Sequence, residues 1–144
     1  MNTDPKPTSG DDKRAHLAMI QGVINRMGGN LFFLKGWAIT LIAALFAATI
    51  SFNTNLCLQL TLAGAILFFW GFDAYFLSHE RCYRDMYDTV RKKNEDEIDF
   101  AMDCKDFKKL ARNTWLGSVF SPTLLWFYVP LTIAMFVVVF LTNQ

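Results

Sequence analysis

Two charged side chains stand alone inside apolar runs, and they are the residues of this chain best suited to specific chemistry. Lys35 is the only charge in residues 31–50, and Asp73 is the only charge in residues 56–77. In an antiparallel helical hairpin the two would lie at similar depth. An ionised carboxylate in hydrocarbon costs at least about 2.5 kcal/mol, which a facing ammonium offsets, so we predict an ion pair. The alternative is that Lys35 reaches lipid head groups while Asp73 faces a water-filled vestibule, where it could conduct ions directly.

A second candidate site is a group of basic residues that follows the second apolar run. Its members are Arg91, Lys92, Lys93, Lys105, Lys108, Lys109 and Arg112. The last four have the spacing i, i+3, i+4 and i+7, which places them on one face of a helix predicted over residues 97–115. Clustered cations bind polyanions such as nucleotides or nucleic acid, since binding releases counterions. Basic residues beside membrane spans also serve topology and bind anionic lipid, so both interpretations stay open.

Other chemistries have little support in the sequence. His79, Cys82 and Cys104 are the set that comes nearest to metal ligands, but no CxxC or HExxH spacing accompanies them, so we expect no metal site and no cofactor. No GxSxG elbow or phosphate-binding glycine loop is found. We therefore expect that the protein is not an enzyme.

The elements that must position these residues are membrane-spanning helices. About 20 apolar residues at a rise of 1.5 Å cover the roughly 30 Å hydrocarbon core of a bilayer, and residues 31–50 and 56–77 are both long enough. Residues 122–144 contain no charge and predict a third span. The sequence of 144 residues, 53% of them hydrophobic, is thus predicted to be an all-α integral membrane protein in which residues 31–77 form a transmembrane hairpin.

The basic residues also predict the orientation in the membrane. All 14 Lys and Arg residues lie either before residue 36 or between residues 81 and 112. The turn at residues 51–55 and the end of the chain at residues 141–144 have none. By the positive-inside rule, the N-terminus and residues 78–121 face the cytosol and the C-terminus faces outward.

The polar segments divide the rest of the chain. Residues 1–12 are rich in Pro, Gly, Ser and Asp and are predicted to be a disordered tail. Residues 13–30 predict an amphipathic helix and a linker, with a break at Gly28, Gly29 and Asn30. Residues 78–121 are predicted to extend the second span into the cytosol and, after an acidic turn at residues 94–97, to form a second cytosolic helix.

Small side chains recur every four residues along the first span. They are Gly36, Thr40, Ala44 and Ala48, and two glycines of the second span, Gly64 and Gly71, could form the receiving face. Strips of this kind allow helices to approach closely in lipid, where apolar burial alone gives no preference for protein over lipid tails. The alternative is that small residues are simply common in membrane helices.

Several short motifs occur together between residues 15 and 93. They are His16-Leu17, IQGVINRM at residues 20–27, FLKGW at residues 33–37, FWGFDAYFL at residues 69–77, Glu80-Arg81, Tyr87-Asp88 and Val90-Arg91. With these motifs the chain resembles the small bacterial SLATT-like transmembrane effectors of anti-phage defence. It is more closely similar to the HalB-type effectors of the Hailong system. Both members of the predicted ion pair fall inside the shared motifs.

The resemblance implies an oligomeric ion-conducting pore in the inner membrane of a bacterial cell, and we expect a homotetramer surrounded by membrane lipids. It also implies that the cytosolic region is gated by a nucleotide signal, such as an oligodeoxynucleotide made by a partner nucleotidyltransferase that holds the effector closed. A function of a different class is a membrane anchor or scaffold that recruits a soluble protein through residues 78–121. Ion flux or toxicity on expression distinguishes the pore from the anchor.

Overall fold

The computed structural model describes residues 10–51 and 56–142. The elements in chain order are α1 (Gly10–Ser51), α2 (Leu56–Val90), the 3-10 helices η1 (Glu95–Glu97), η2 (Lys105–Lys109) and η3 (Ala111–Asn113), α3 (Trp115–Val119) and α4 (Pro122–Thr142). Within the described ranges the chain has no strand, so the all-α prediction is confirmed for them. The helices α1, α2 and α4 are long and apolar enough to cross a membrane, as expected of a membrane protein with three spans.

Two of the predicted segments lie partly outside these ranges. Of the tail predicted at residues 1–12, residues 1–9 are not described and residues 10–12 begin α1. Of the turn predicted at residues 51–55, Ser51 ends α1 and residues 52–55 are not described. The third span begins at Pro122, which agrees with the predicted start of that helix.

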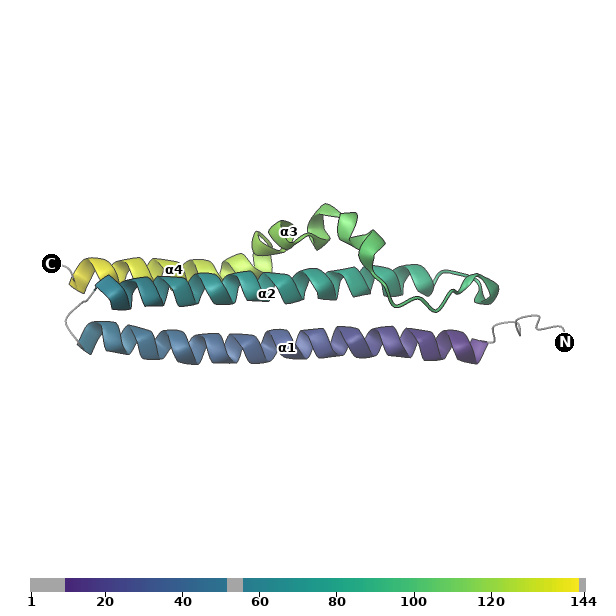
Figure 1. Cartoon of the computed structure of the whole chain (residues 1–144), viewed down its shortest axis with the longest axis horizontal. Helices are drawn as coiled ribbons and strands as arrows, with labels where there is room; N and C mark the ends of the chain where they lie inside the picture. Colours follow the sequence, from purple (N-terminus) through teal and green to yellow (C-terminus); the bar gives the residue numbers. More distant parts are fainter. Residues whose placement is uncertain (1–9, 52–55, 143–144) are drawn as a thin grey trace.

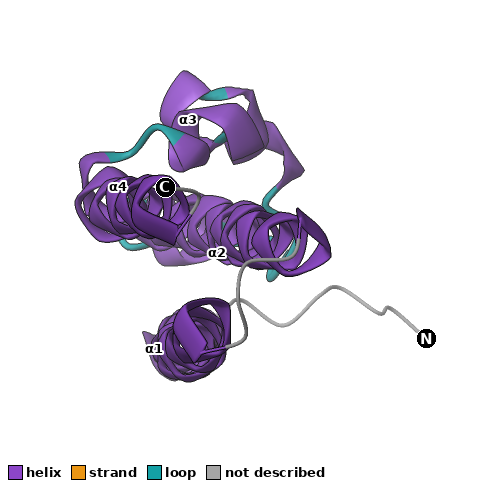
Figure 2. Ribbon diagram, turned by 90° about the vertical axis from the view of Figure 1, so that its left-hand side faces the viewer, coloured by secondary structure: helices purple, strands orange, loops and turns teal. Residues whose placement is uncertain are grey.

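The helices α1 and α2 form a long antiparallel hairpin, and α4 lies along one half of it (Figure 1). At 1.5 Å per residue, the 42 residues of α1 extend about 63 Å, roughly twice the hydrocarbon core of a bilayer. We call the half that contains α4 the span region (residues 31–51, 56–77 and 122–142) and the other half the head region (residues 10–30 and 78–121). Figure 2 shows α2 and α4 side by side, with α1 on one side of them and α3 on the other.

The first helix is continuous where the sequence predicted a break. Gly28, Gly29 and Asn30 all lie inside α1, so residues 13–30 are the first part of one long helix and not a separate element. A glycine costs a helix about 1 kcal/mol relative to alanine. Packing against α2 on both sides of the glycines offsets this cost, since Ile24 is buried before them and Ala38 after them.

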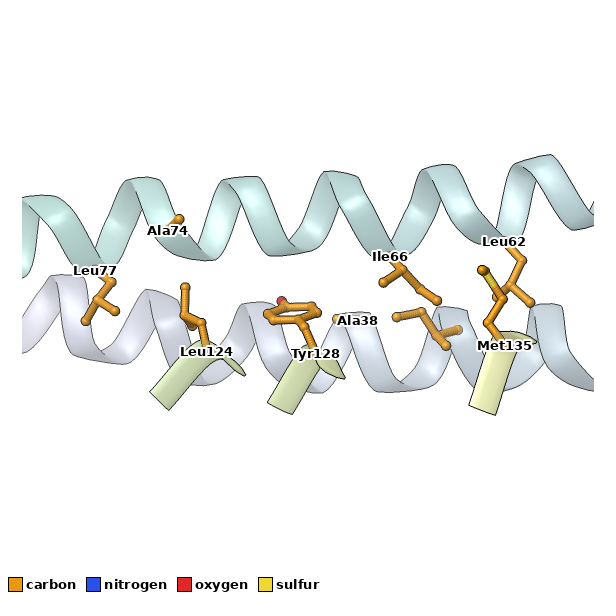
Figure 3. Packing of buried hydrophobic residues seen from close by; sticks show 9 residues of the cluster. Ala38, Leu62, Ile66, Ala74, Leu77, Leu124, Tyr128 and Met135 are labelled. Carbon is orange, nitrogen blue, oxygen red and sulfur yellow. The ribbon is translucent and has the colours of Figure 1, made fainter. Parts of the chain in front are cut away.

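The span region is held together by one apolar cluster to which all three long helices contribute. Its buried members are Ala38, Ile42, Leu62, Ile66, Ala74, Leu77, Leu124, Tyr128 and Met135. Figure 3 shows the three side chains of α4 among those of α1 and α2. The outer surface is apolar too: Trp37 is 71% exposed and Phe68 is 63% exposed. Large apolar side chains on both faces are expected where the outer face meets lipid.

The head region has a second, smaller core. Its buried residues are Ile20, Ile24, Cys82, Met86, Val90 and Cys104. The apolar face predicted for residues 13–30 therefore packs on α2 and on the segment that follows it. The amphipathic part of α1 stabilises the head region by burial of apolar surface from water.

Residues 91–121 do not form the second long helix predicted there. The side chains of Asp99 and Asp103 accept hydrogen bonds from the backbone N–H groups two residues later, at 3.1 and 3.0 Å, and such bonds compete with helix formation. Phe100 has a φ of 53°, in the left-handed region, which no α-helix tolerates. The segment instead folds into η1, η2, η3 and α3, separated by extended residues that lie along α2 (Figure 1).

Candidate functional site

The structure brings Lys35 and Asp73 together, as the sequence predicts. Lys35 Nζ donates a hydrogen bond to Asp73 Oδ2 at 2.7 Å. Tyr128 of α4 donates its hydroxyl to the same carboxylate oxygen at 3.0 Å. The Asp73 side chain is fully buried and the Lys35 side chain is 25% exposed. Each of the long helices thus contributes one polar group to a site that we call the three-helix cluster (Lys35, Asp73 and Tyr128).

This cluster lies inside the span region, near the end that joins the head region. Tyr128 is six residues after Pro122 in α4, a distance of about 9 Å at 1.5 Å per residue. At such a depth an isolated carboxylate is costly, and here the ammonium of Lys35 and the phenol of Tyr128 both donate hydrogen bonds to Asp73. The second carboxylate oxygen, Asp73 Oδ1, is buried and accepts no hydrogen bond from any part of the chain that the structure describes.

Aromatic side chains surround the cluster and connect it to the end of the head region. Trp70 stacks on Tyr128 with ring centroids 5.6 Å apart and an angle of 6° between the rings. The indole of Trp70 donates to the carbonyl of Val119 at 3.1 Å. Lys35 Nζ lies 5.8 Å from the ring centroid of Phe127, within the range of a cation–π interaction. The α3 segment is therefore tied to α2 at the depth of the ion pair.

Helical spacing explains why these groups meet, including the one that sequence reasoning missed. Asp73 is seven residues after the buried Ile66, and Tyr128 is four residues after the buried Leu124, so each polar group lies on the apolar stripe of its helix. Tyr128 was not among the predicted site residues. The signal that could have identified it is a phenol on a buried stripe, because a buried tyrosine hydroxyl usually finds a hydrogen-bond partner.

The small-residue strip of α1 does not pack inside this chain. Gly36, Thr40 and Ala44 are exposed, and Ala48 is half-buried. The buried residues of α1 in the span region, Ala38, Ile42 and Thr49, lie on the other side of the helix. The strip therefore faces away from α2 and α4.

The receiving face predicted on α2, Gly64 and Gly71, does not receive α1 within one chain. A Cβ atom added at Gly64 would meet nothing within 4 Å. Gly71 lies against Trp115, whose ring atom would be 3.5 Å from such a Cβ and whose indole N–H donates to the carbonyl of Gly71 at 2.9 Å. The glycine accommodates the tryptophan of α3, and α1 does not contact it there.

The seven basic residues do not share one helix face, because residues 97–115 are not one helix. Four of them form ion pairs: Arg91 with Asp88 at 2.9 Å, Lys105 with Asp103 at 2.9 Å, Lys109 with Asp106 at 3.0 Å, and Arg112 with Asp85. Lys108 Nζ lies 3.2 Å from His79 Nε2. Over the described ranges, Lys92, Lys93 and Lys108 pair with no carboxylate. Exposed ion pairs are weak, so a polyanion can compete for the paired cations.

Asp85 connects α2 to η3 and was not predicted from the sequence. Its carboxylate accepts hydrogen bonds from Arg112 and from Asn113 Nδ2, the latter at 2.6 Å. Asn113 is 2% exposed and also donates to the carbonyl of Phe107 at 2.9 Å. One side chain of α2 therefore holds two turns of the head region in place.

His79, Cys82 and Cys104 are not arranged as metal ligands. Within residues 10–51 and 56–142, no group of three or more His, Cys, Asp or Glu residues is placed to hold a metal ion. The thiol of Cys82 donates to the carbonyl of Cys104 at 2.8 Å. Burial, followed by a side-chain interaction with Cys104, raises the pKa of the Cys82 thiol to about 12, so the thiol is neutral at physiological pH.

Comparisons of the chain with protein families, curated proteins and solved structures give no match. The functional interpretation therefore depends on the geometry of the three-helix cluster and the head region.

Proposed function

We propose that this chain is a subunit of an oligomeric ion-conducting pore, an effector of anti-phage defence in a bacterial inner membrane, gated through its cytosolic head region. The observation that carries the proposal is the three-helix cluster. Ionisable residues inside membrane spans are rare and costly, and they are characteristic of functional sites such as ion pathways. Here one pair lies within a bundle of three spans and is linked to all of them.

In this proposal the cluster stabilises the closed arrangement of the helices. Lys35 and Asp73 neutralise one another in the closed state and present no net charge to an ion path. Separation of α1 from α2 would expose the carboxylate of Asp73 to water and so attract cations. Both helices continue without a break into the head region, so a ligand that prefers one arrangement there shifts the equilibrium of the pair.

The geometry of one chain supports the proposal of an oligomer. Three spans packed around an apolar cluster leave no room for a water-filled path. Several copies can enclose one, and the exposed strip of Gly36, Thr40 and Ala44 offers a surface for close helix contact between them. We propose a homotetramer.

The proposed gating ligand is a nucleotide or an oligodeoxynucleotide supplied by a partner nucleotidyltransferase. Lys92, Lys93 and Lys108 are its first contacts in this proposal, since they have no carboxylate to exchange for a phosphate among the described residues. Changing Lys92 and Lys93 to Gln together should flatten the dependence of log Kd on log salt by about two units if each contacts one phosphate. The same variant should leak more in flux assays, because a ligand that holds the pore closed would bind less. An unchanged slope would show that Lys92 and Lys93 do not contact phosphate, and would favour the interpretation that they serve membrane topology.

The pore is tested by reconstitution of the purified chain into liposomes that contain an ion-sensitive dye. We expect flux that rises with a power of protein density greater than one, since several copies form one pore. Ala44→Leu fills the exposed strip and should remove most of the flux. Ala43→Leu adds the same volume about 100° around the same helix and serves as the matched control.

Two results would reject the pore. One is inert liposomes with a correctly inserted protein, which would favour the membrane anchor that recruits a soluble partner. The other is equal loss of flux in both leucine variants, which would show that added bulk, and not the strip, is responsible.

A further inference from the structure

A pocket lined by arginines lies where α2, η3 and the start of α4 meet. It encloses about 370 Å³. Three guanidinium groups line it, those of Arg81 and Arg84 from α2 and Arg112 from η3, together with Asp85 and residues around the start of α4. Neither Arg81 nor Arg84 belongs to the basic group proposed above to contact a nucleotide.

The charges in this pocket do not balance. Arg84 pairs with Glu80 at 2.6 Å, and Arg112 pairs with Asp85. Arg81 donates to the backbone carbonyl of Arg112 at 2.9 Å and has no carboxylate partner in residues 10–51 or 56–142. Three guanidinium groups against two carboxylates leave one positive charge uncompensated. A single phosphodiester carries one negative charge and would neutralise it.

The pocket lies at the boundary between the span region and the head region. Arg81 is four residues beyond Leu77, the last residue of the apolar run of α2, and Pro122 is the first residue of α4. The adjoining surface is apolar: Phe120 is 66% exposed, Leu116 is 60% exposed and Trp126 is 83% exposed. Exposed aromatic residues next to a span are typical of the level of the lipid head groups. The positive end of the α4 dipole also points to this boundary.

We propose that the pocket binds the phosphate of one anionic membrane lipid, whose acyl chains lie along Phe120 and the start of α4. The planar fork of an arginine matches a phosphate in geometry and charge. A soluble phosphate compound shares this chemistry but makes no use of the exposed apolar residues beside the pocket. The bound lipid connects α2, η3 and α4 at the junction of the two regions.

The proposal is tested with the purified full chain, stripped of lipid in a neutral detergent and titrated with phosphatidylglycerol or with phosphatidylcholine of the same chain length. Native mass spectrometry counts the lipids bound to each chain. We expect one tight phosphatidylglycerol per chain and no comparable site for phosphatidylcholine. Arg81→Gln should lower the affinity for phosphatidylglycerol about tenfold, the effect of one lost charge-assisted hydrogen bond.

Matched variants keep this test decisive. Arg14→Gln removes the same charge from a head-region side chain that is 83% exposed and lies outside the pocket, and it should bind phosphatidylglycerol like the wild type. Arg84→Gln changes a side chain that is 63% exposed, so it keeps the fold even if Arg81→Gln does not, and it should also weaken binding. Wild-type affinity in both Arg81→Gln and Arg84→Gln, or an equal loss in Arg14→Gln, overturns the proposal.

The source of the phosphate is tested separately. Glycerol 3-phosphate and inorganic phosphate are added to the lipid-free protein, and the melting temperature is followed by tryptophan fluorescence. We expect a rise with phosphatidylglycerol that none of the soluble compounds reproduces. A soluble compound that raises the melting temperature equally, and displaces the lipid, would assign the pocket to a soluble ligand and overturn the lipid.

Discussion

The span region and the head region are two halves of the same two helices, and their polar side chains are arranged in opposite ways. In the head region the apolar core lies inside and most ion pairs lie outside: Arg91 and Asp88 are more than half exposed, whereas Ile20 is fully buried. Two ion pairs there have a largely buried carboxylate, that of Glu80 or Asp85, but their arginines are exposed. In the span region the surface is apolar, and the one ion pair is buried. The same fold thus places charge according to the solvent that surrounds each half.

This difference indicates what stabilises each half. In water, burial of Ile20, Ile24 and Met86 supplies the driving force, and exposed ion pairs add little. In lipid, apolar burial gives no preference for protein, so helix association depends on close packing and on polar contacts. The bonds from Lys35 and Tyr128 to Asp73 are such contacts. Polar substitutions should therefore matter far more in the span region than in the head region.

The largest loss of stability is expected for Asp73→Ala. The change leaves the ammonium of Lys35 and the hydroxyl of Tyr128 without their partner at membrane depth, which we expect to cost about 3 kcal/mol or more. Yield of the folded protein and its resistance to denaturing detergent should both fall. Lys105→Gln, which breaks an exposed ion pair in the head region, is the control and should change neither.

Two double variants sharpen this result. Exchange of the charges, Lys35→Asp with Asp73→Lys, should recover part of the loss, since the pair is restored in reverse. Lys35→Met with Asp73→Leu should recover stability but not regulated flux, because it removes both charges together. If the single variants Lys35→Ala and Asp73→Ala assemble like the wild type, then polar contacts do not contribute more to stability in the span region than in the head region.

Substitution of glycines should change the free energy of unfolding less, and the sign of the change should differ between two positions. A Cβ atom at Gly117 would lie 2.1 Å from the carbonyl oxygen of Ala111, so Gly117→Ala must displace backbone and should cost about 1–3 kcal/mol. A Cβ atom at Gly28 would meet nothing within 4 Å, and Gly28→Ala should stabilise α1 by up to about 1 kcal/mol. Thermal unfolding in detergent measures both. A loss in Gly28→Ala would mean that α1 needs its glycines to bend.

The smallest predicted effect is a dependence of the free energy of unfolding on pH, and it arises in the head region. The Cys82 thiol has a pKa of about 12 in the folded chain, against an ordinary value of 9.0. Below pH 9 the thiol is protonated in both states and its contribution is fully present. Between pH 9 and 12 only the unfolded chain releases the proton, so stability falls as pH rises. Cys82→Ala should flatten this fall, as measured by unfolding at pH 8 and pH 10, and an unchanged slope would place its source elsewhere.

The sequence predicted the features that depend on rare residues in long apolar runs. A single charge in each run leaves few arrangements, so the pairing of Lys35 and Asp73 followed from depth alone. The third span was evident from residues 122–144, which carry no charge. These predictions depend on whether lipid or water surrounds a segment. The amino-acid composition of the segment indicates which of the two it is.

The predictions that were wrong concern segments in which local interactions compete with tertiary packing. Gly28 and Gly29 are local signals for a helix end, but packing on α2 outweighs them. Residues 97–115 have helical periodicity, but the side chains of Asp99 and Asp103 bond to nearby backbone and divert the chain. The face presented by the small-residue strip could not be predicted either, because Ala38 and Ala74 are equally small and occupy the buried side instead.

The position of Lys35 and Asp73 within one hairpin has a consequence for the synthesis of the chain. The two residues are 38 positions apart, whereas Tyr128 is 55 positions beyond Asp73. A ribosome therefore completes both members of the ion pair well before the phenol exists. The hairpin can enter the bilayer with its two charges already neutralised, as a single inserting unit. The helix α4 arrives later and adds the tyrosine hydroxyl to a carboxylate that is already in the membrane.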